Sequence, residues 1–169
     1  MPVASFGFSI LQRQRQLLGT RFAARYPHDW LIWEAGPWRP ATTRTARDTE
    51  STRLPDSAGP ARPIGEDFLC FVLDPNRSPL HVGRATTNDI AINDLTASRD
   101  QFVFDFENGL WRVRSLQPGA LLDGADLAEQ PTPIASQSRL TVGAVFLTFL
   151  NSTDLIRRLA TAESSQPAL

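Results

Sequence analysis

Side chains that could hold an anion gather between residues 80 and 102, in the stretch LHVGRATTNDIAINDLTASRDQF. Arg84 follows a glycine at the end of a short apolar run, and Ser98 and Arg99 stand together in a later turn-like stretch. A guanidinium fork, a hydroxyl and the N–H groups of turns form a donor set that suits a phosphate dianion. The spacing therefore predicts a phosphate-type site built on loops at one end of a β-rich scaffold.

The residue inventory offers no comparable site for catalysis or for a metal. The chain has two histidines and a single cysteine. It lacks a Walker phosphate loop and any metal-ligand spacing, and its acidic residues are scattered on turns, where solvation explains them. We therefore expect no enzyme activity, no cofactor and no metal. Cys70 lies inside the apolar run FLCFVL and is interpreted as a small buried hydrophobe.

Charge and hydropathy exclude further classes of partner. The formal net charge is −1, and the arginines among residues 13–62 are interspersed with glutamines, threonines and acids, so we expect no nucleic-acid ligand. No apolar run reaches the roughly 18 residues of a membrane-spanning helix, and the first residues do not resemble a signal peptide. A lone cysteine allows no disulfide within the chain, which favours a cytoplasmic location.

Residues 66–150 have the pattern of an all-β domain. The alternation of Phe102, Phe104 and Phe106 marks one buried face of a strand, and Asn108-Gly109 predicts a tight hairpin turn after it. Many short strands at this spacing favour a β-sandwich of two antiparallel sheets. Further turn signals are Asp74-Pro75-Asn76, Pro118-Gly119 and Asp123-Gly124.

Residues 1–38 are predicted to be an N-terminal extension made of a helix and a Trp-rich strand. Ser9 and Gln12 have the spacing of a capping box at the start of the helix. The strand around residues 29–33 is apolar on both faces, so we expect it to be buried. The helix is expected to bury one face that contains Ile10, Leu11, Leu17, Leu18 and Phe22.

Two segments lack the β pattern. Residues 39–65 are rich in Thr, Ser, Pro and Arg and nearly free of large apolar side chains, so they are predicted to be a flexible linker. Residues 151–169 are predicted to form a short helix, capped by Asn151 or Ser152, followed by a tail.

The order of motifs in residues 66–150 resembles the forkhead-associated (FHA) domain. Gly83-Arg84 matches the family's Gly-Arg, NDIAIND at residues 88–94 matches its usual continuation, and ASRDQF at residues 97–102 matches the element that carries the family's serine. NGLWRVRSL, LLDGADL and RLTVGAVFLTFL resemble later strands of the family. The resemblance implies an FHA-like β-sandwich whose loops at one end bind phosphothreonine peptides.

By this resemblance, the phosphopeptide-binding residues are Arg84, Ser98, Arg99, Thr87 and Gln117. Arg84 would supply the guanidinium fork to the phosphate, Ser98 would supply a hydroxyl, and Arg99 would add charge at the rim. An ion pair of Arg84 with Asp89 or Asp94 is the structural alternative for that arginine.

Two positions depart from the family pattern. Gln101 stands where the family has a histidine that supports the loops, and an amide can still donate and accept hydrogen bonds. Pro118-Gly119 stands where the family has an Asn-Gly whose asparagine holds the peptide backbone, and proline has neither a side-chain amide nor an N–H. The phosphate-binding half of the site is therefore predicted to be present and the peptide-clamping half to be missing.

Two functions follow from these features. One is a recognition module for phosphothreonine peptides in bacterial Ser/Thr kinase signalling, in which phosphorylation at Thr45, Thr49 or Thr52 lets the linker fold back onto its own domain. The other is a phosphate-independent scaffold or assembly component, of the kind found in secretion systems, that binds an unphosphorylated protein partner. In the second reading the N-terminal extension forms an interface with a partner or a homo-oligomer.

Overall fold

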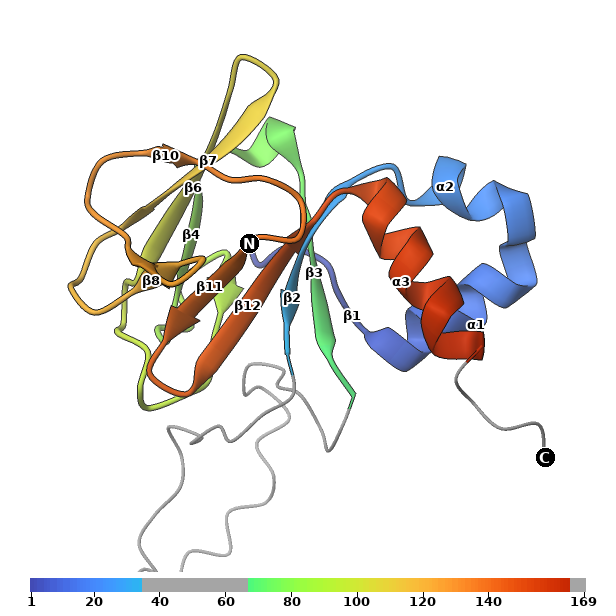
Figure 1. The fold of residues 1–169 in the computed structure, drawn as a ribbon, viewed down its shortest axis with the longest axis horizontal. Helices are drawn as coiled ribbons and strands as arrows, with labels where there is room; N and C mark the ends of the chain where they lie inside the picture. The colour runs from blue at the N-terminus through green and yellow to red at the C-terminus, as the bar shows by residue number, and fades with distance from the viewer. Residues whose placement is uncertain (35–66, 165–169) are drawn as a thin grey trace, which may run out of the picture.

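The protein, described by a computed structural model over residues 1–34 and 67–164, consists of two facing β-sheets with helices against one of them (Figure 1). The seven-stranded sheet has the order β1-β3-β2-β12-β11-β8-β9, and the five-stranded sheet has the order β10-β7-β6-β4-β5. All strand pairs are antiparallel apart from β4 and β5, which pair in parallel. The predicted β-sandwich is therefore confirmed.

The elements follow one another along the chain with short connections. The strands are β1 (Ser5–Gly7), β2 (Asp29–Trp33), β3 (Leu69–Leu73), β4 (Leu80–Gly83), β5 (Ile90–Ala91), β6 (Phe102–Glu107), β7 (Leu110–Ser115), β8 (Leu121–Leu122), β9 (Ala125–Asp126), β10 (Thr132–Pro133), β11 (Arg139–Val142) and β12 (Val145–Leu150). The helices are α1 (Phe8–Leu18), α2 (Phe22–Arg25) and α3 (Ser152–Ser164), with single 3-10 turns η1 (Gly19–Arg21) and η2 (Pro75–Arg77).

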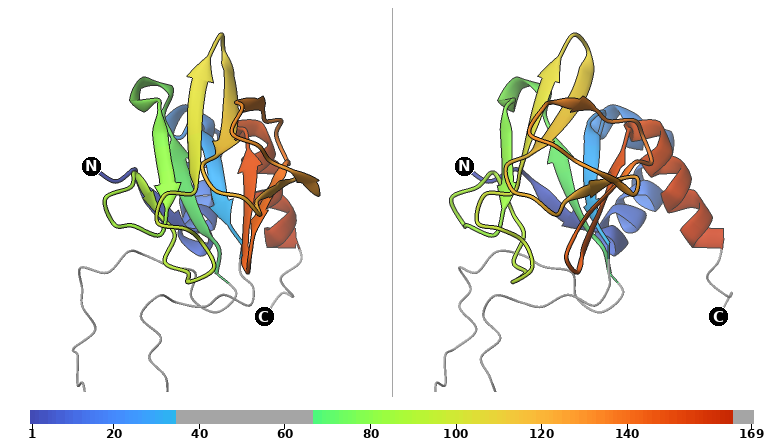
Figure 2. Two further views of the ribbon diagram at one scale, coloured as in Figure 1. Left: turned by 90° about the vertical axis from the view of Figure 1, so that its left-hand side faces the viewer. Right: turned by 60° about the vertical axis from the view of Figure 1, so that its left-hand side comes forward.

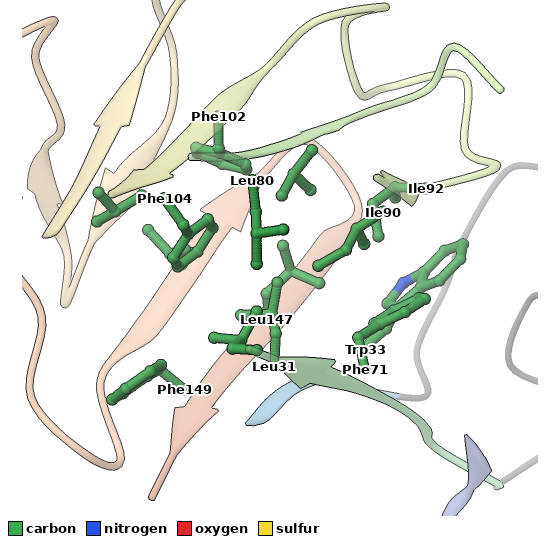
Figure 3. Packing of buried hydrophobic residues seen from close by; sticks show 14 of the residues in the cluster. Leu31, Trp33, Phe71, Leu80, Ile90, Ile92, Phe102, Phe104, Leu147 and Phe149 are labelled. Atoms are coloured by element: carbon green, nitrogen blue, oxygen red, sulfur yellow. The ribbon is translucent and has the colours of Figure 1, made fainter. Parts of the chain in front are cut away.

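The main hydrophobic core fills the space between the two sheets (Figure 3). Phe102 and Phe104 of β6 point into it and are fully buried, as their alternation in the sequence predicts, whereas Phe106 near the strand end is only partly buried. Leu80 of β4 and Leu147 of β12 reach the same core from the two opposite sheets. This core gives the loops at its ends a rigid support.

A second core lies between the seven-stranded sheet and the helices. Leu31 and Trp33 of β2 face the first core, and Trp30 and Ile32 face the second, so both faces of this strand are buried as predicted. Cys70 of β3 belongs to the second core, and its burial raises the pKa of the thiol. Strand β2 lies between β3 and β12, so residues 29–33 are an inner strand of the sandwich itself.

The start of α1 differs from the predicted capping box. Gly7 occupies the N-cap position, and no side chain caps the helix there. Ser9 instead donates from its backbone N–H and from its hydroxyl to the carboxylate of Asp67, at 2.9 and 2.8 Å. The predicted apolar face is also only partly correct, because Leu11 and Phe22 are buried whereas Ile10 and Leu17 are 50% and 80% exposed.

Helix α3 packs on the same side of the sheet as α1 (Figure 1). The side-chain oxygen of Asn151 accepts a hydrogen bond from the N–H of Asp154 at 2.8 Å, which confirms Asn151 as the cap. Leu155 and Leu159 point from α3 into the second core. Within the described residues, no helix is both long and apolar enough to cross a membrane.

Candidate functional site

Three loops that emerge from one end of the sandwich carry the residues predicted to bind an anion (Figure 2). Residues 84–89 connect β4 to β5, residues 92–101 connect β5 to β6, and residues 116–120 connect β7 to β8. Backbone hydrogen bonds join the first two loops, from Arg84 N–H to the Ser98 carbonyl at 2.8 Å and from Ala85 N–H to the Arg99 carbonyl at 3.0 Å. The structure thus places Arg84 beside Ser98, although fourteen positions separate them in the sequence.

Gly83 is required by close packing between these loops. A Cβ at this position would overlap the carbonyl oxygen of Arg99 and would lie 2.8 Å from the carbonyl carbon of Arg99 and 2.9 Å from Nδ2 of Asn88. Its φ is not in the left-handed region. The glycine therefore provides room for a second backbone, rather than the flexibility that its place before Arg84 suggested.

Arg84 is held by its backbone and by one end of its guanidinium. Its Nε donates to the carbonyl oxygen of Ala97 at 3.2 Å. Among the described residues, its two terminal nitrogens make no hydrogen bond or ion pair, and the side chain is partly exposed. A guanidinium held in this way offers two parallel N–H donors to a phosphate or carboxylate.

The proposed ion-pair partners of Arg84 have other roles. Asp89 accepts hydrogen bonds from the N–H of His81 at 2.8 Å and from Arg77 at 3.3 Å. Asp94 accepts from the N–H of Thr96 at 2.8 Å and from its hydroxyl at 2.5 Å. The alternative of a structural ion pair for Arg84 with either aspartate is therefore wrong.

Gln101 connects the second loop to the third. Its side-chain oxygen accepts from the N–H of Ser98 at 3.0 Å, and its side-chain nitrogen donates to Oγ of Ser115 at 3.2 Å. Ser115 Oγ in turn lies 2.6 Å from the carbonyl oxygen of Gln117, to which it donates. Gln101 is 1% exposed, so this amide performs the loop support expected at its position.

Asn88 is a loop-closing residue, as its turn-like context suggested. Its Nδ2 donates to the carbonyl oxygens of Arg99 and Ala85, at 2.6 and 3.1 Å. Its side chain is buried, and it fastens the first loop to the second from below the anion site. Its exact partners were missed in the sequence because they lie on a distant loop that no local pattern identifies.

A separate contact fastens the second loop to the turn between β11 and β12. The hydroxyl of Thr96 accepts a hydrogen bond from the N–H of Ala144 at 2.9 Å. A Cβ on Gly143 would overlap the Thr96 side chain, and Gly143 has a φ of 55°. The tip of the second loop is therefore supported on both sides before any ligand binds.

The other predicted binding residues surround this arrangement. Arg99 is exposed, while its carbonyl serves as the acceptor for the first loop. Thr87 is exposed on the first loop and Gln117 on the third. Ser98 is partly buried, and its backbone rather than its hydroxyl makes the hydrogen bonds found among the described residues. Their roles in ligand binding stay predictions.

The Pro118-Gly119 turn has the geometry that its residues require. Gly119 has a φ of 93°, which fits the third position of a turn of type II. Gln117, Pro118 and Gly119 are all exposed. This third loop thus offers a proline ring and a glycine where an amide side chain would be needed to hold a peptide backbone.

Two kinds of prediction concern other parts of the chain. Thr45, Thr49 and Thr52, the predicted phosphorylation sites, lie outside the described residues. In the part of the chain that the structure describes, no three His, Cys, Asp or Glu side chains are grouped so as to hold a metal ion.

Comparison with known families identifies the central part of the chain. Residues 80–143 match the family model of the FHA domain. This range includes Arg84, Ser98, Gln101 and the Pro118-Gly119 turn, so the match covers all three loops. A comparison with curated proteins gave no match.

Several solved FHA domains are similar in structure at low sequence identity. The FHA domain of the CT664 protein from Chlamydia trachomatis is 13% identical, with 73% of this chain and 97% of that chain covered and a TM-score of 0.49. The FHA domain of an Arabidopsis thaliana protein is 18% identical, with 73% and 86% covered and a TM-score of 0.48. The MEK1 FHA domain, solved with the HOP1 pThr318 peptide, is 15% identical, with 48% and 87% covered and a TM-score of 0.43.

Proposed function

Because this chain carries an FHA domain that includes residues 80–143, we propose that it is a protein-recognition module that binds phosphothreonine peptides through the loops after β4, β5 and β7. The observation that supports this most directly is the state of Arg84. Its Nε is occupied by the carbonyl of Ala97, while its terminal nitrogens have no acceptor among the described residues. A buried structural arginine would be expected to have all of its donors paired.

The chemistry of the loops suits a phosphorylated side chain. In this proposal the terminal nitrogens of Arg84 donate to two phosphate oxygens, and the hydroxyl of Ser98 donates to a third. Arg99, exposed at the rim, adds positive charge that attracts the dianion. Thr87 and Gln117 contact the peptide on either side of the phosphate.

Calorimetry with phosphothreonine peptides tests this function. Binding should require the phosphate, and Arg84→Ala should weaken it by about 1.5–3 kcal/mol, the usual contribution of a hydrogen bond to a charged group. Arg84→Lys should restore only part of the loss, because an ammonium cannot donate in a fork. A module that binds phosphorylated and unphosphorylated peptides equally well, or an Arg84→Ala variant with unchanged affinity, would contradict the proposal.

The partners proposed are substrates of a bacterial Ser/Thr kinase in the cytoplasm, and the linker is proposed as an internal ligand. Thr45, Thr49 and Thr52 lie among arginines and acids just before the domain. A phosphate on one of them would compete with external peptides by a high effective concentration. Phosphorylating the full chain should therefore weaken peptide binding, and a triple Thr→Ala variant should not respond. Equal affinity before and after phosphorylation would argue against self-binding.

A second candidate function rests on the third loop. Pro118 has no N–H, and Gly119 has no side chain with which to hold a peptide backbone. This favours a scaffold that binds a folded, unphosphorylated partner or a second copy of the chain through its N-terminal elements. A partner that is captured equally by the parent and by Arg84→Ala, without phosphate, would favour the scaffold. Sedimentation of the full chain tests the homo-oligomer.

A further inference from the structure

A groove adjoins the third loop of the proposed phosphate site. It encloses about 410 Å³ between the segment 115–120 and the segment 126–129. Ser115 lines this groove and is also bonded to Gln101, which holds the N–H of Ser98. The groove and the phosphate-binding loops therefore share one hydrogen-bonded bridge and lie next to each other.

The walls of the groove are formed by paired backbone. The N–H of Ser115 donates to the carbonyl of Ala128 at 3.0 Å, and the N–H of Leu127 donates to the carbonyl of Ala120 at 2.9 Å. The two segments are thereby held at a set spacing in the free protein. A preformed groove loses little conformational entropy when it takes up a ligand.

The lining has an apolar part and two carboxylates. Ala120 and Leu127 are buried, and Pro118 presents its ring beside them. Asp126 and Glu129 line the same groove and are exposed. Among the described residues, neither carboxylate makes a hydrogen bond or an ion pair, in contrast to Asp89 and Asp94 on the neighbouring loops, which do.

This combination matches an amphipathic cation. Arginine and lysine carry an aliphatic stem that packs on apolar surface and a charged head that stays in contact with solvent or with carboxylates. An acidic side chain would be repelled by Asp126 and Glu129, and a large apolar side chain would leave both carboxylates without a partner. The charge of the groove is also opposite to that of Arg84 and Arg99 across the bridge.

We propose that the groove between residues 115–120 and 126–129 binds an arginine or lysine side chain of the same peptide whose phosphothreonine binds at Arg84. The proposal rests on the proposed function and adds to it the class of ligand: a peptide with a phosphate followed or preceded, on one side only, by a basic residue. Because an extended peptide crosses the loops in one direction, only one of its two flanks reaches the groove.

Fluorescence anisotropy with a set of synthetic peptides tests this inference. Each peptide contains phosphothreonine in a polyalanine context with solubilising ends, and one arginine is placed at a single position on either flank. At one position or two adjacent positions on one flank, arginine should tighten binding by about fivefold, the upper range for a partly exposed ion pair. The gain should shrink at higher ionic strength because the carboxylates are exposed.

Variants of the groove separate this effect from general attraction. Asp126→Asn and Glu129→Gln together should remove the arginine preference and leave the affinity for the all-alanine phosphopeptide unchanged. Glu107→Gln is the matched control, since it removes one exposed carboxylate at the β6–β7 hairpin outside the groove, and it should leave the preference intact. Equal loss of preference in the control would show that net charge, not the groove, is responsible.

The outcomes distinguish the groove from the phosphate site. If the all-alanine phosphopeptide binds and arginine at no position improves it, or improves it equally on both flanks, the groove proposal is overturned and the proposed function stands. If no phosphopeptide binds, the proposed function fails, and the groove proposal fails with it. An arginine peptide that binds equally without phosphate would also overturn the joint ligand.

Discussion

The backbone N–H of Ser98 is donated to the side-chain oxygen of Gln101 at 3.0 Å. The same amide group donates from its nitrogen to Ser115 Oγ at 3.2 Å, so one buried side chain spans the second and third loops. Because Ser98 also accepts from the N–H of Arg84, a shift of Gln101 would be passed to the arginine. Gln101 is therefore a positioning residue for the proposed site.

Replacing Gln101 with methionine should destabilise the fold and weaken phosphopeptide binding. The substitution keeps the shape but leaves the N–H of Ser98 without its acceptor, and a lost hydrogen bond that leaves a buried group unpaired costs about 1–3 kcal/mol. Urea unfolding and calorimetry measure the two effects. Ser115→Ala is the matched comparison, because it removes only the second contact of the bridge. A variant with reduced stability but full affinity would show that Gln101 supports the fold and not the site.

Gly83→Ala should destabilise the protein more than a glycine outside the left-handed region usually does. The added Cβ meets the backbone of Arg99, which has no rotamer by which to move aside. Forcing an extra methyl group into close-packed surroundings costs about 1–3 kcal/mol. The free energy of unfolding in urea checks this, and Thr86→Ala, at an exposed position on the same loop, is the control. A Gly83→Ala variant as stable as the control would contradict the packing described.

Arg158 should be far more important to stability than its neighbour Arg157. Arg158 donates from two nitrogens to both carboxylate oxygens of Glu34, at 2.6 and 2.7 Å, and its guanidinium lies over the ring of Phe68. Arg158→Ala should therefore lower the free energy of unfolding by about 1.5–3 kcal/mol, as for hydrogen bonds between charged groups. Lysine at this position should restore only part, because it cannot form the fork.

The control for Arg158 lies one position earlier. The side chain of Arg157 is 67% exposed, and it pairs with Asp154 on the surface of the same helix. Arg157→Ala should leave the unfolding transition nearly unchanged, since exposed ion pairs contribute little. Equal effects of the two substitutions would mean that helical charge, and not the contact with Glu34, determines the result.

Asp29 should make stability depend on pH in the acidic range. Burial raises the pKa of this carboxyl above its ordinary value of 3.8, while the hydrogen bond from Trp111 Nε1 and the charge of His28 act in the opposite direction. The folded chain therefore holds the proton more tightly than the unfolded chain does. The stability from this group is complete below pH 3.8 and is lost as the pH rises through the folded-state pKa.

Asp29→Asn tests this dependence. Asparagine can still accept the hydrogen bond from Trp111, and it carries no charge that burial would penalise. Relative to the parent, the variant should gain stability as the pH rises from the acidic range to neutrality, in urea unfolding measured along a pH series. A gain that is the same at every pH, or a loss at neutral pH, would show that the carboxylate is not the titrating group.

Most of the strands could be predicted from the sequence because their signals are local. Asn108 and Gly109 have φ values of 53° and 78°, and they connect β6 and β7 by the two-residue turn that the dipeptide favours. The alternation of residues 29–33 likewise predicted a strand with two apolar faces, and both faces are buried. Asn151 caps α3 through an oxygen three residues before its partner, which is again a contact within one turn.

The helix α1 could be predicted only in part, for a physical reason. Its periodicity identifies the helix, but the choice of buried face depends on what lies against it. Ser9 is bonded to Asp67, and Leu11 packs with residues of β2, β3 and α3, all of them distant in the sequence. Ile10 and Leu17 project away from these neighbours and remain exposed.

For the candidate site, the sequence by itself determined the residue types: an arginine after a glycine, a serine and an arginine in a second loop, and a proline-glycine turn in a third. These are properties of short motifs, so they can be recognised without a structure. Only the tertiary structure decided that Gly83 makes room for the backbone of Arg99, that Asn88 and Gln101 fasten the loops, and that Arg84 has no acidic partner among the described residues. Those relationships join segments brought together by the pairing of β4 with β6 and by the shared core, and long-range packing leaves no local trace in the chain.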